Sequence, residues 1–95
     1  MPKSGLPKGF KLDYKPIAQE IERLLKKLIR KKGLIKTGNM YKSINVVADK
    51  KGNFDIQAIY YFVYVDARYS LVDEVFNSSE LDEFIENEIA YQIDL

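Results

Sequence analysis

The sequence predicts a single α+β domain, made of a long N-terminal helix, a small antiparallel β-sheet and a C-terminal helix packed on the sheet. Two features of the pattern lead to this fold class. Apolar residues recur at helical spacing over residues 13–32 and again beyond residue 79, whereas they alternate with polar residues over 44–60. A third observation limits the size, because 95 residues, 46% of them hydrophobic, are enough for one small globular domain.

Residues 1–12, MPKSGLPKGFKL, are expected to form a flexible arm in front of the domain of residues 13–95. Two Pro, two Gly and three Lys in this stretch argue against a packed element. The arm either frays as an ordinary terminus or orders on a neighbouring molecule. In the second case its anchors would be the large apolar side chains Leu6, Phe10 and Leu12.

The clearest helix is expected over residues 13–32. Asp13 or Tyr14 begins it, and Pro16 suits the first turn, where a missing backbone N–H costs nothing. One apolar stripe follows at helical spacing, formed by Ile17, Ile21, Leu24, Leu25 and Leu28. The last turns carry a basic face ahead of Gly33, a natural C-cap, and this face consists of Lys26, Lys27, Arg30, Lys31 and Lys32.

The basic face has two open interpretations. Cations near a helix C-terminus complement the negative end of the helix dipole, so the cluster can be an ordinary solvated face. It can also face nucleic acid or an acidic neighbour. The first 51 residues hold 14 Lys or Arg and 4 Asp or Glu, a net charge of +10, whereas residues 52–95 hold 1 and 10, a net of −9. The basic and acidic parts of the chain can neutralise each other within the monomer, or each can meet its opposite on a neighbouring copy.

The stretch LIKTGNMYKSINVV, residues 34–47, is expected to turn sharply from the helix into a β-hairpin. Thr37 or Asn39 can cap a short helical turn, and Gly38 permits the bend between them. These three residues are therefore predicted to form a structural turn. Alternating apolar residues then predict a hairpin over 44–60. Its loop is expected at DKKGN, residues 49–53.

The tyrosine-rich stretch YYFVYVDARYS is ambiguous, because it could extend the second strand or form a short helical step. Seven tyrosines in 95 residues is a high number. Tyrosine packs at the rim of a core with its hydroxyl in water, and it is also enriched at protein interfaces. On the second interpretation, the interface candidates are Tyr60, Tyr61, Tyr64, Asp66, Arg68 and Tyr69.

The last part of the chain is expected to hold a third short strand, SLVDEVF at residues 70–76, and a final helix. Asn77, Ser78 or Ser79 caps this helix, whose first turn is acidic. Its apolar stripe would be Leu81, Phe84, Ile85, Ile89 and Ile93.

The composition argues against chemistry. The chain has no Cys and no His, so it cannot form thiolate or imidazole metal sites or nucleophiles activated by His. No glycine-rich phosphate loop and no EF-hand spacing are present. We therefore expect a protein that is not an enzyme and that needs no cofactor or metal. No apolar run approaches a membrane span of about 20 residues, and MPKSG lacks the apolar centre of a signal peptide, so we expect a soluble intracellular chain.

Two short motifs follow one another along the chain: KTGNMYKSI at residues 36–44 and IYYFVYVD at residues 59–66. The predicted hairpin lies between them. Together they resemble the tail-component, or tail-completion, family of long-tailed phages, named for gene product ten of a lambdoid coliphage. Members of that family carry Thr-Gly-x-Leu-x-x-Ser-Ile, then a β-hairpin, then Tyr-Ala-x-Tyr-Val-Glu.

Both family motifs are matched nearly residue by residue, over about residues 17–66. The first, with Met in place of Leu, is matched by Thr37, Gly38, Met40, Ser43 and Ile44. The second, with Phe in place of Ala and Asp in place of Glu, is matched by Tyr61, Tyr64, Val65 and Asp66. Beyond the second motif the chain has Ala67 and Arg68 where members have Gly-Thr.

The resemblance implies a structural virion protein of the head–tail junction. Such proteins form homo-oligomeric rings between connector and tail tube and catalyse nothing. Their partners are other neck and tail proteins and the DNA that passes through the lumen, with no membrane involved. The chain would lie in the virion tail or neck, and in the host cytoplasm during assembly. The alternative from the residues alone is a small nucleic-acid-binding or regulatory module that uses the basic face.

Overall fold

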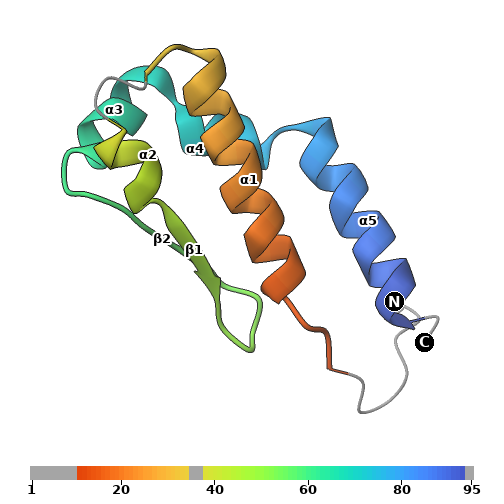
Figure 1. The fold of residues 1–95 in the computed structure, drawn as a ribbon. Helices are drawn as coiled ribbons and strands as arrows, with labels where there is room; N and C mark the ends of the chain where they lie inside the picture. Colours follow the sequence, from red (N-terminus) through yellow and green to blue (C-terminus); the bar gives the residue numbers. More distant parts are fainter. Residues whose placement is uncertain (1–10, 35–37, 94–95) are drawn as a thin grey trace.

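The computed structural model describes residues 11–34 and 38–93, so the predicted arm lies outside the described residues except for its last two positions. The predicted α+β class is confirmed. Figure 1 shows a long central helix with the hairpin on one side and the C-terminal helix on the other. In chain order the elements are α1 (Lys15–Lys31), α2 (Asn39–Ser43), β1 (Asn45–Ala48), β2 (Phe54–Gln57), α3 (Phe62–Tyr69), α4 (Leu71–Phe76) and α5 (Ser79–Ile93).

Helix α1 organises the fold because it is buried over about half of its circumference. At 100° per residue, Ala18 and Ile29 extend the predicted apolar stripe sideways, and both are buried. The wide apolar face lets α1 contact β1, α4 and α5, with the hairpin and α5 on opposite sides of α1 in Figure 1. The C-terminal helix therefore packs on α1 and not on the sheet, which corrects the predicted packing.

The predicted hairpin forms, with strands shorter than the range 44–60. The strands β1 and β2 pair antiparallel, with Asn45 opposite Gln57, Val46 opposite Ile56, Val47 opposite Asp55 and Ala48 opposite Phe54. The loop is held by Asp49, whose carboxylate accepts hydrogen bonds from the backbone N–H groups of Lys51 and Asn53 at 2.8 and 2.9 Å. These bonds hold the pKa of Asp49 below its ordinary value, the bonds from Asn53 most of all.

The stretch SLVDEVF is a helix, α4, so the predicted third strand is wrong. Leu71 and Val75 are buried, whereas Asp73 between them is exposed. A strand, with its period of two, would place all three on one face, so this pattern is helical. Ser70 takes a left-handed conformation, φ 54°, between α3 and α4. The Asp66 carboxylate accepts a hydrogen bond from the Val72 N–H at 2.8 Å and so supports the first turn of α4.

Helix α5 begins as the sequence predicts. The Ser78 hydroxyl accepts a hydrogen bond from the Leu81 N–H at 3.2 Å, and Glu80 and Asp82 lie in the first turn. Leu81 is buried against the core, whereas Phe84 and Ile85 are half-buried at its edge. Within the described residues, no helix has the length and apolarity that crossing a membrane requires.

Candidate functional site

The Thr-Gly turn of the first motif contains a left-handed glycine. Gly38 has φ 84° and stands directly before α2, and its carbonyl accepts a hydrogen bond from the Lys42 N–H at 2.9 Å. Asn39 is the first residue of α2, while Thr37 lies outside the described residues. A Cβ on Gly38 would meet only the Lys42 side chain, at 3.9 Å. The requirement for glycine here therefore comes from the backbone conformation and not from lack of space.

The remaining residues of the first motif join α2 to the hairpin. The Ser43 hydroxyl donates a hydrogen bond to the Met40 carbonyl at 2.7 Å and accepts one from the Ile59 N–H at 2.9 Å. It thereby connects the end of α2 to the chain that leaves β2, 16 residues later. Met40 and Ile44 are buried in the core on either side. The motif thus has a structural explanation at each of its described positions.

The tyrosine-rich stretch forms the helix α3, which resolves the ambiguity left by the sequence. Phe62 is buried, and Tyr61 and Val65 are partly buried against the core. Asp66 is occupied with α4 through the Val72 N–H. Of the four residues that match the family's second motif, Tyr61, Tyr64, Val65 and Asp66, the exposed one is Tyr64.

Three apolar side chains form an exposed face on α3. Tyr60, Val63 and Tyr64 are 78%, 66% and 72% exposed. Val63 and Tyr64 lie in the first turn of α3, and Tyr60 lies in the turn directly before it. We call this set the α3 tyrosine face. Contiguous exposed apolar residues on a small domain mark an interaction site more often than single ones do.

Two further interface candidates lie beside this face. The Arg68 guanidinium lies 5.9 Å from the centre of the Tyr69 ring, and both residues are exposed. The Tyr60 ring packs edge-on against Tyr61, with 5.5 Å between ring centres. The structure therefore places four of the six candidates at the surface, Tyr60, Tyr64, Arg68 and Tyr69, and two in supporting roles, Tyr61 and Asp66.

The basic face of α1 is largely engaged within the chain. Lys27 and Lys32 form ion pairs with Glu80 and Glu74, at 3.4 Å each. Arg30 donates a hydrogen bond to the Tyr41 hydroxyl at 3.0 Å, and Lys26 pairs with Glu22 at 3.3 Å. Lys31 makes no ion pair within residues 11–34 and 38–93. The basic first half thus meets the acidic second half inside one molecule.

Glu80 is the centre of these contacts. Its carboxylate accepts from Arg23 at 2.8 Å and pairs with Lys27, so it ties the first turn of α5 to α1. The Arg23 hydrogen bond lowers the pKa of Glu80, and Lys27 adds to this effect. In turn, Glu20 and then Glu80 raise the pKa of Arg23. Arg23, Lys27 and Glu80 are each about half exposed, so the contribution of the two Glu80 pairs to stability is small.

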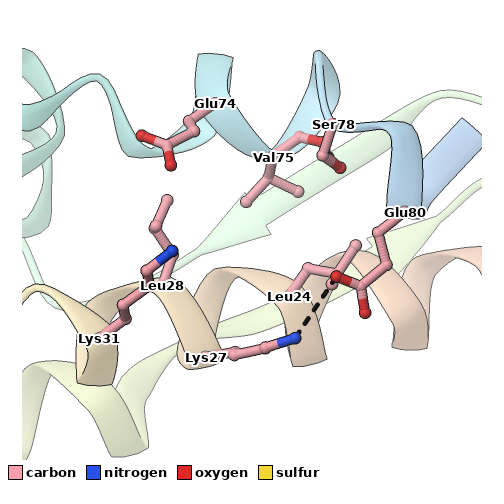
Figure 2. A pocket seen from close by; sticks show the side chains of 8 residues that line it. All are labelled: Leu24, Lys27, Leu28, Lys31, Glu74, Val75, Ser78 and Glu80. Atoms are coloured by element: carbon pink, nitrogen blue, oxygen red, sulfur yellow. Dashed lines mark hydrogen bonds and ion pairs between the residues drawn. The ribbon is translucent and has the colours of Figure 1, made fainter.

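A small pocket lies beside these ion pairs, between α1, α4 and α5. Its volume is about 150 Å³. Figure 2 shows Leu24, Leu28 and Val75 in its apolar interior and charged side chains around them, with Lys27 joined to Glu80 and Lys31 across from Glu74. The opposite charges around it offer no net attraction for an anion or a cation.

No metal centre is apparent in the described part of the chain, which holds no group of three or more Asp, Glu, His or Cys residues placed to bind an ion. Comparison of the chain with protein-family models, with curated proteins and with solved structures finds no match. The resemblance to the phage tail-completion family therefore stays a prediction that depends on the two motifs.

The sequence alone does not reveal the structural roles of three residues at these sites, Val63, Ser43 and Glu80. Val63 joins Tyr64 on the α3 tyrosine face because the stretch is helical, which the sequence left open. Ser43 was matched to a motif, but its two hydrogen bonds depend on where β2 ends. Glu80 was read as an ordinary first-turn acid. Its pairing with α1 could not be predicted because α5 was expected to pack on the sheet.

Proposed function

We propose that this chain is a structural subunit of a homo-oligomeric ring at the head–tail junction of a long-tailed phage. The observation that carries the proposal is the α3 tyrosine face. It combines exposed apolar side chains with the second family motif, in which Tyr64 is the exposed residue. A contact between subunits accounts for such a residue, because tyrosine is enriched where interfaces are buried.

The arrangement of elements supports the same proposal. The described residues of the first motif build the turn and the join to the hairpin, so that motif is explained as part of the fold. On this proposal the chain catalyses nothing. Its partners are further copies of itself, other neck and tail proteins, and DNA in the ring lumen. It resides in the virion, after assembly in the host cytoplasm.

The alternative, a nucleic-acid-binding or regulatory module, receives less support. Phosphate binding needs cations that are free to release their counterions. Lys27 and Lys32 are paired with Glu80 and Glu74 of the same chain, and Arg30 is held by Tyr41. Negative charges on α4 and α5 therefore lie next to the surface that would have to approach DNA.

The double variant Tyr60→Ser with Tyr64→Ser tests the proposal. Both side chains are exposed, so we expect the variant to fold, which circular dichroism checks. Sedimentation velocity should show the wild-type chain in an assembly many times its 11.0 kDa mass and the variant as smaller species. The matched control is Tyr91→Ser on α5, which is also exposed and should assemble normally. Normal assembly of the double variant would contradict a contact through α3.

A further inference from the structure

The hydrogen-bonding pattern of the hairpin determines which backbone groups point outward. The Asp49 N–H donates to the Asn53 carbonyl at 3.0 Å, so this pair next to the loop is hydrogen bonded. Antiparallel pairs alternate between hydrogen-bonded and non-hydrogen-bonded. The pairs Ala48–Phe54 and Val46–Ile56 are therefore non-hydrogen-bonded, and their N–H and C=O groups point away from the hairpin.

The two outer edges of the hairpin differ. On β1, the outward Val46 N–H donates to the Glu22 carboxylate of α1 at 3.0 Å, and α1 packs along this strand. On β2, no group within residues 11–34 and 38–93 accepts a hydrogen bond from the Phe54 or Ile56 N–H. Strand β2 packs chiefly on β1. An edge with unpaired donors and acceptors is a template for another strand.

We propose that the outer edge of β2 pairs antiparallel with β2 of a second copy of this chain, with Ile56 opposite Ile56. The product is a four-stranded sheet in the order β1, β2, β2, β1. An isolated two-stranded hairpin is only marginally stable in water, whereas a sheet of three or more strands with an apolar face can be stable. The described residues hold no further strand that could pair with this edge.

The register follows from the side chains of β2. Only residues whose backbone N–H and C=O groups point outward can form the hydrogen-bonded pairs across the new contact. Three registers remain: Phe54 opposite Phe54 of the second copy, Ile56 opposite Ile56, or Phe54 opposite Ile56. The last register places two Asp55 carboxylates directly opposite each other, which is unfavourable. Centring on Ile56 instead places Asp55 opposite Gln57 of the second copy, an acceptor opposite a donor. It also uses all four residues of β2, whereas centring on Phe54 does not.

Burial of apolar side chains also favours β2 of a second copy as the partner strand. The inner face of the edge carries Phe54, Ile56 and Ala58, which are only partly buried in one molecule. In the Ile56 register each of them gains an apolar neighbour, Phe54 meeting Ala58 and Ile56 meeting Ile56. The contact is two-fold, so it closes at two copies. It uses a different surface from the ring contact through α3, so it is tested in the Tyr60→Ser, Tyr64→Ser variant, in which the ring contact is removed.

Opposite charges at position 57 test the proposal. Gln57→Glu places a carboxylate opposite Asp55 twice per dimer, and Gln57→Lys places an ammonium there. Both variants lose the hydrogen bonds that Gln57 makes with Asn45 and with Asp55 of the same chain. The new charge also acts on that Asp55 within the monomer, so thermal unfolding of each variant is measured alongside. In the Tyr60→Ser, Tyr64→Ser background, analytical ultracentrifugation should show a dimer dissociation constant about 2- to 30-fold higher for Glu and similarly lower for Lys, relative to the same background with Gln57.

The matched controls are Asn45→Glu and Asn45→Lys, on the same outer face but on β1. They should change dimerisation little and not in opposite directions. Opposite shifts at position 57 with none at position 45 support the proposal. A chain that stays monomeric at millimolar concentration, or equal shifts for Glu and Lys at position 57, overturns it.

An independent test uses the absence of cysteine from the chain. Asp55→Cys mixed with Gln57→Cys should form an intermolecular disulfide under mild oxidation, because these positions form a non-hydrogen-bonded pair with Cα atoms about 4.5 Å apart. Each variant alone should cross-link much less. Efficient cross-linking of Asp55→Cys alone would overturn the register. Failure here leaves the ring proposal untouched, because the assembly of the Tyr60 and Tyr64 variants is measured separately.

Discussion

Ser43 illustrates how one side chain determines a junction between distant segments. Its hydroxyl is the acceptor for the Ile59 N–H and the donor to the Met40 carbonyl. Ser43→Ala leaves the half-buried N–H unsatisfied, which should lower the free energy of unfolding by about 1–2 kcal/mol. Urea denaturation measures this loss. Ser79→Ala, at an exposed serine, is the control, and an equal effect of the two substitutions would refute the role given to Ser43.

Two left-handed glycines separate the effect of backbone strain from the effect of crowding. Gly38 has φ 84° in open space, so Gly38→Ala should cost roughly 1–2 kcal/mol from the backbone alone. Gly52 has φ 90°, and a Cβ there would lie 2.9 Å from the Tyr14 ring. Gly52→Ala should therefore cost more. In a Tyr14→Ala background the extra cost of Gly52→Ala should disappear. Thermal unfolding of wild type, Gly52→Ala, Tyr14→Ala and the double variant measures this cost, and an extra cost that remains without the Tyr14 ring would contradict crowding at Gly52.

At the scale of elements, Glu80 links α5 to α1 in a pH-dependent way. Its pKa is lowered in the folded state by Arg23 and Lys27, so its stabilising effect is complete above the unfolded value of about 4.3. The effect is lost as pH falls through the lower folded pKa. The difference in stability between wild type and Glu80→Gln should therefore shrink in acid.

Glu86→Gln is the matched control for this titration, because Glu86 is exposed on the same helix and makes no ion pair among the described residues. Its stability difference from wild type should vary less with pH than that of Glu80→Gln. Added salt should reduce the Glu80 effect at neutral pH, because exposed charges are screened. If the stability difference between wild type and Glu80→Gln is the same at pH 7 and pH 3, Glu80 does not link α5 to α1 through its charge.

How far the sequence predicts the elements depends on how local their signals are. Helix α1, the hairpin loop and the Ser78 cap of α5 are set by neighbouring residues, and the structure has them close to where they were expected. The short run SLVDEVF contains two apolar pairs that suit a strand or a helix equally. Its helical form is decided by Leu71 and Val75 packing against α1, a contact between distant parts of the chain.

At the scale of the whole molecule, α1 lies between the hairpin and α5 (Figure 1), and it also contacts α4. The sequence showed the charge split between its halves but not where the opposite charges meet. They meet within the molecule at Glu74 and Glu80, because α5 lies against α1 and not on the sheet. The split therefore contributes to the fold itself, and the α3 tyrosine face is the stronger candidate for assembly.

Because basic-face lysines pair with α4 and α5 of the same chain, reversing their charge should change the stability of the monomer. Lys27→Glu places a carboxylate beside Glu80 and should lower the melting temperature of the monomer. Lys31→Glu removes no ion pair among the described residues, so it should leave that temperature nearly unchanged. Differential scanning calorimetry at low salt compares the two variants. A larger effect of Lys31→Glu would contradict the pairing of α1 with α5.

The mass of the assembled wild-type chain tests the central claim most directly. Native mass spectrometry of the full chain should show one closed species, a fixed multiple of 11.0 kDa greater than two, and electron microscopy should show it as a ring. Its subunits should separate when Tyr60 and Tyr64 are replaced by Ser. A chain that remains a monomer or dimer at every concentration, and that shifts DNA at moderate salt, would contradict the ring and support the nucleic-acid-binding alternative.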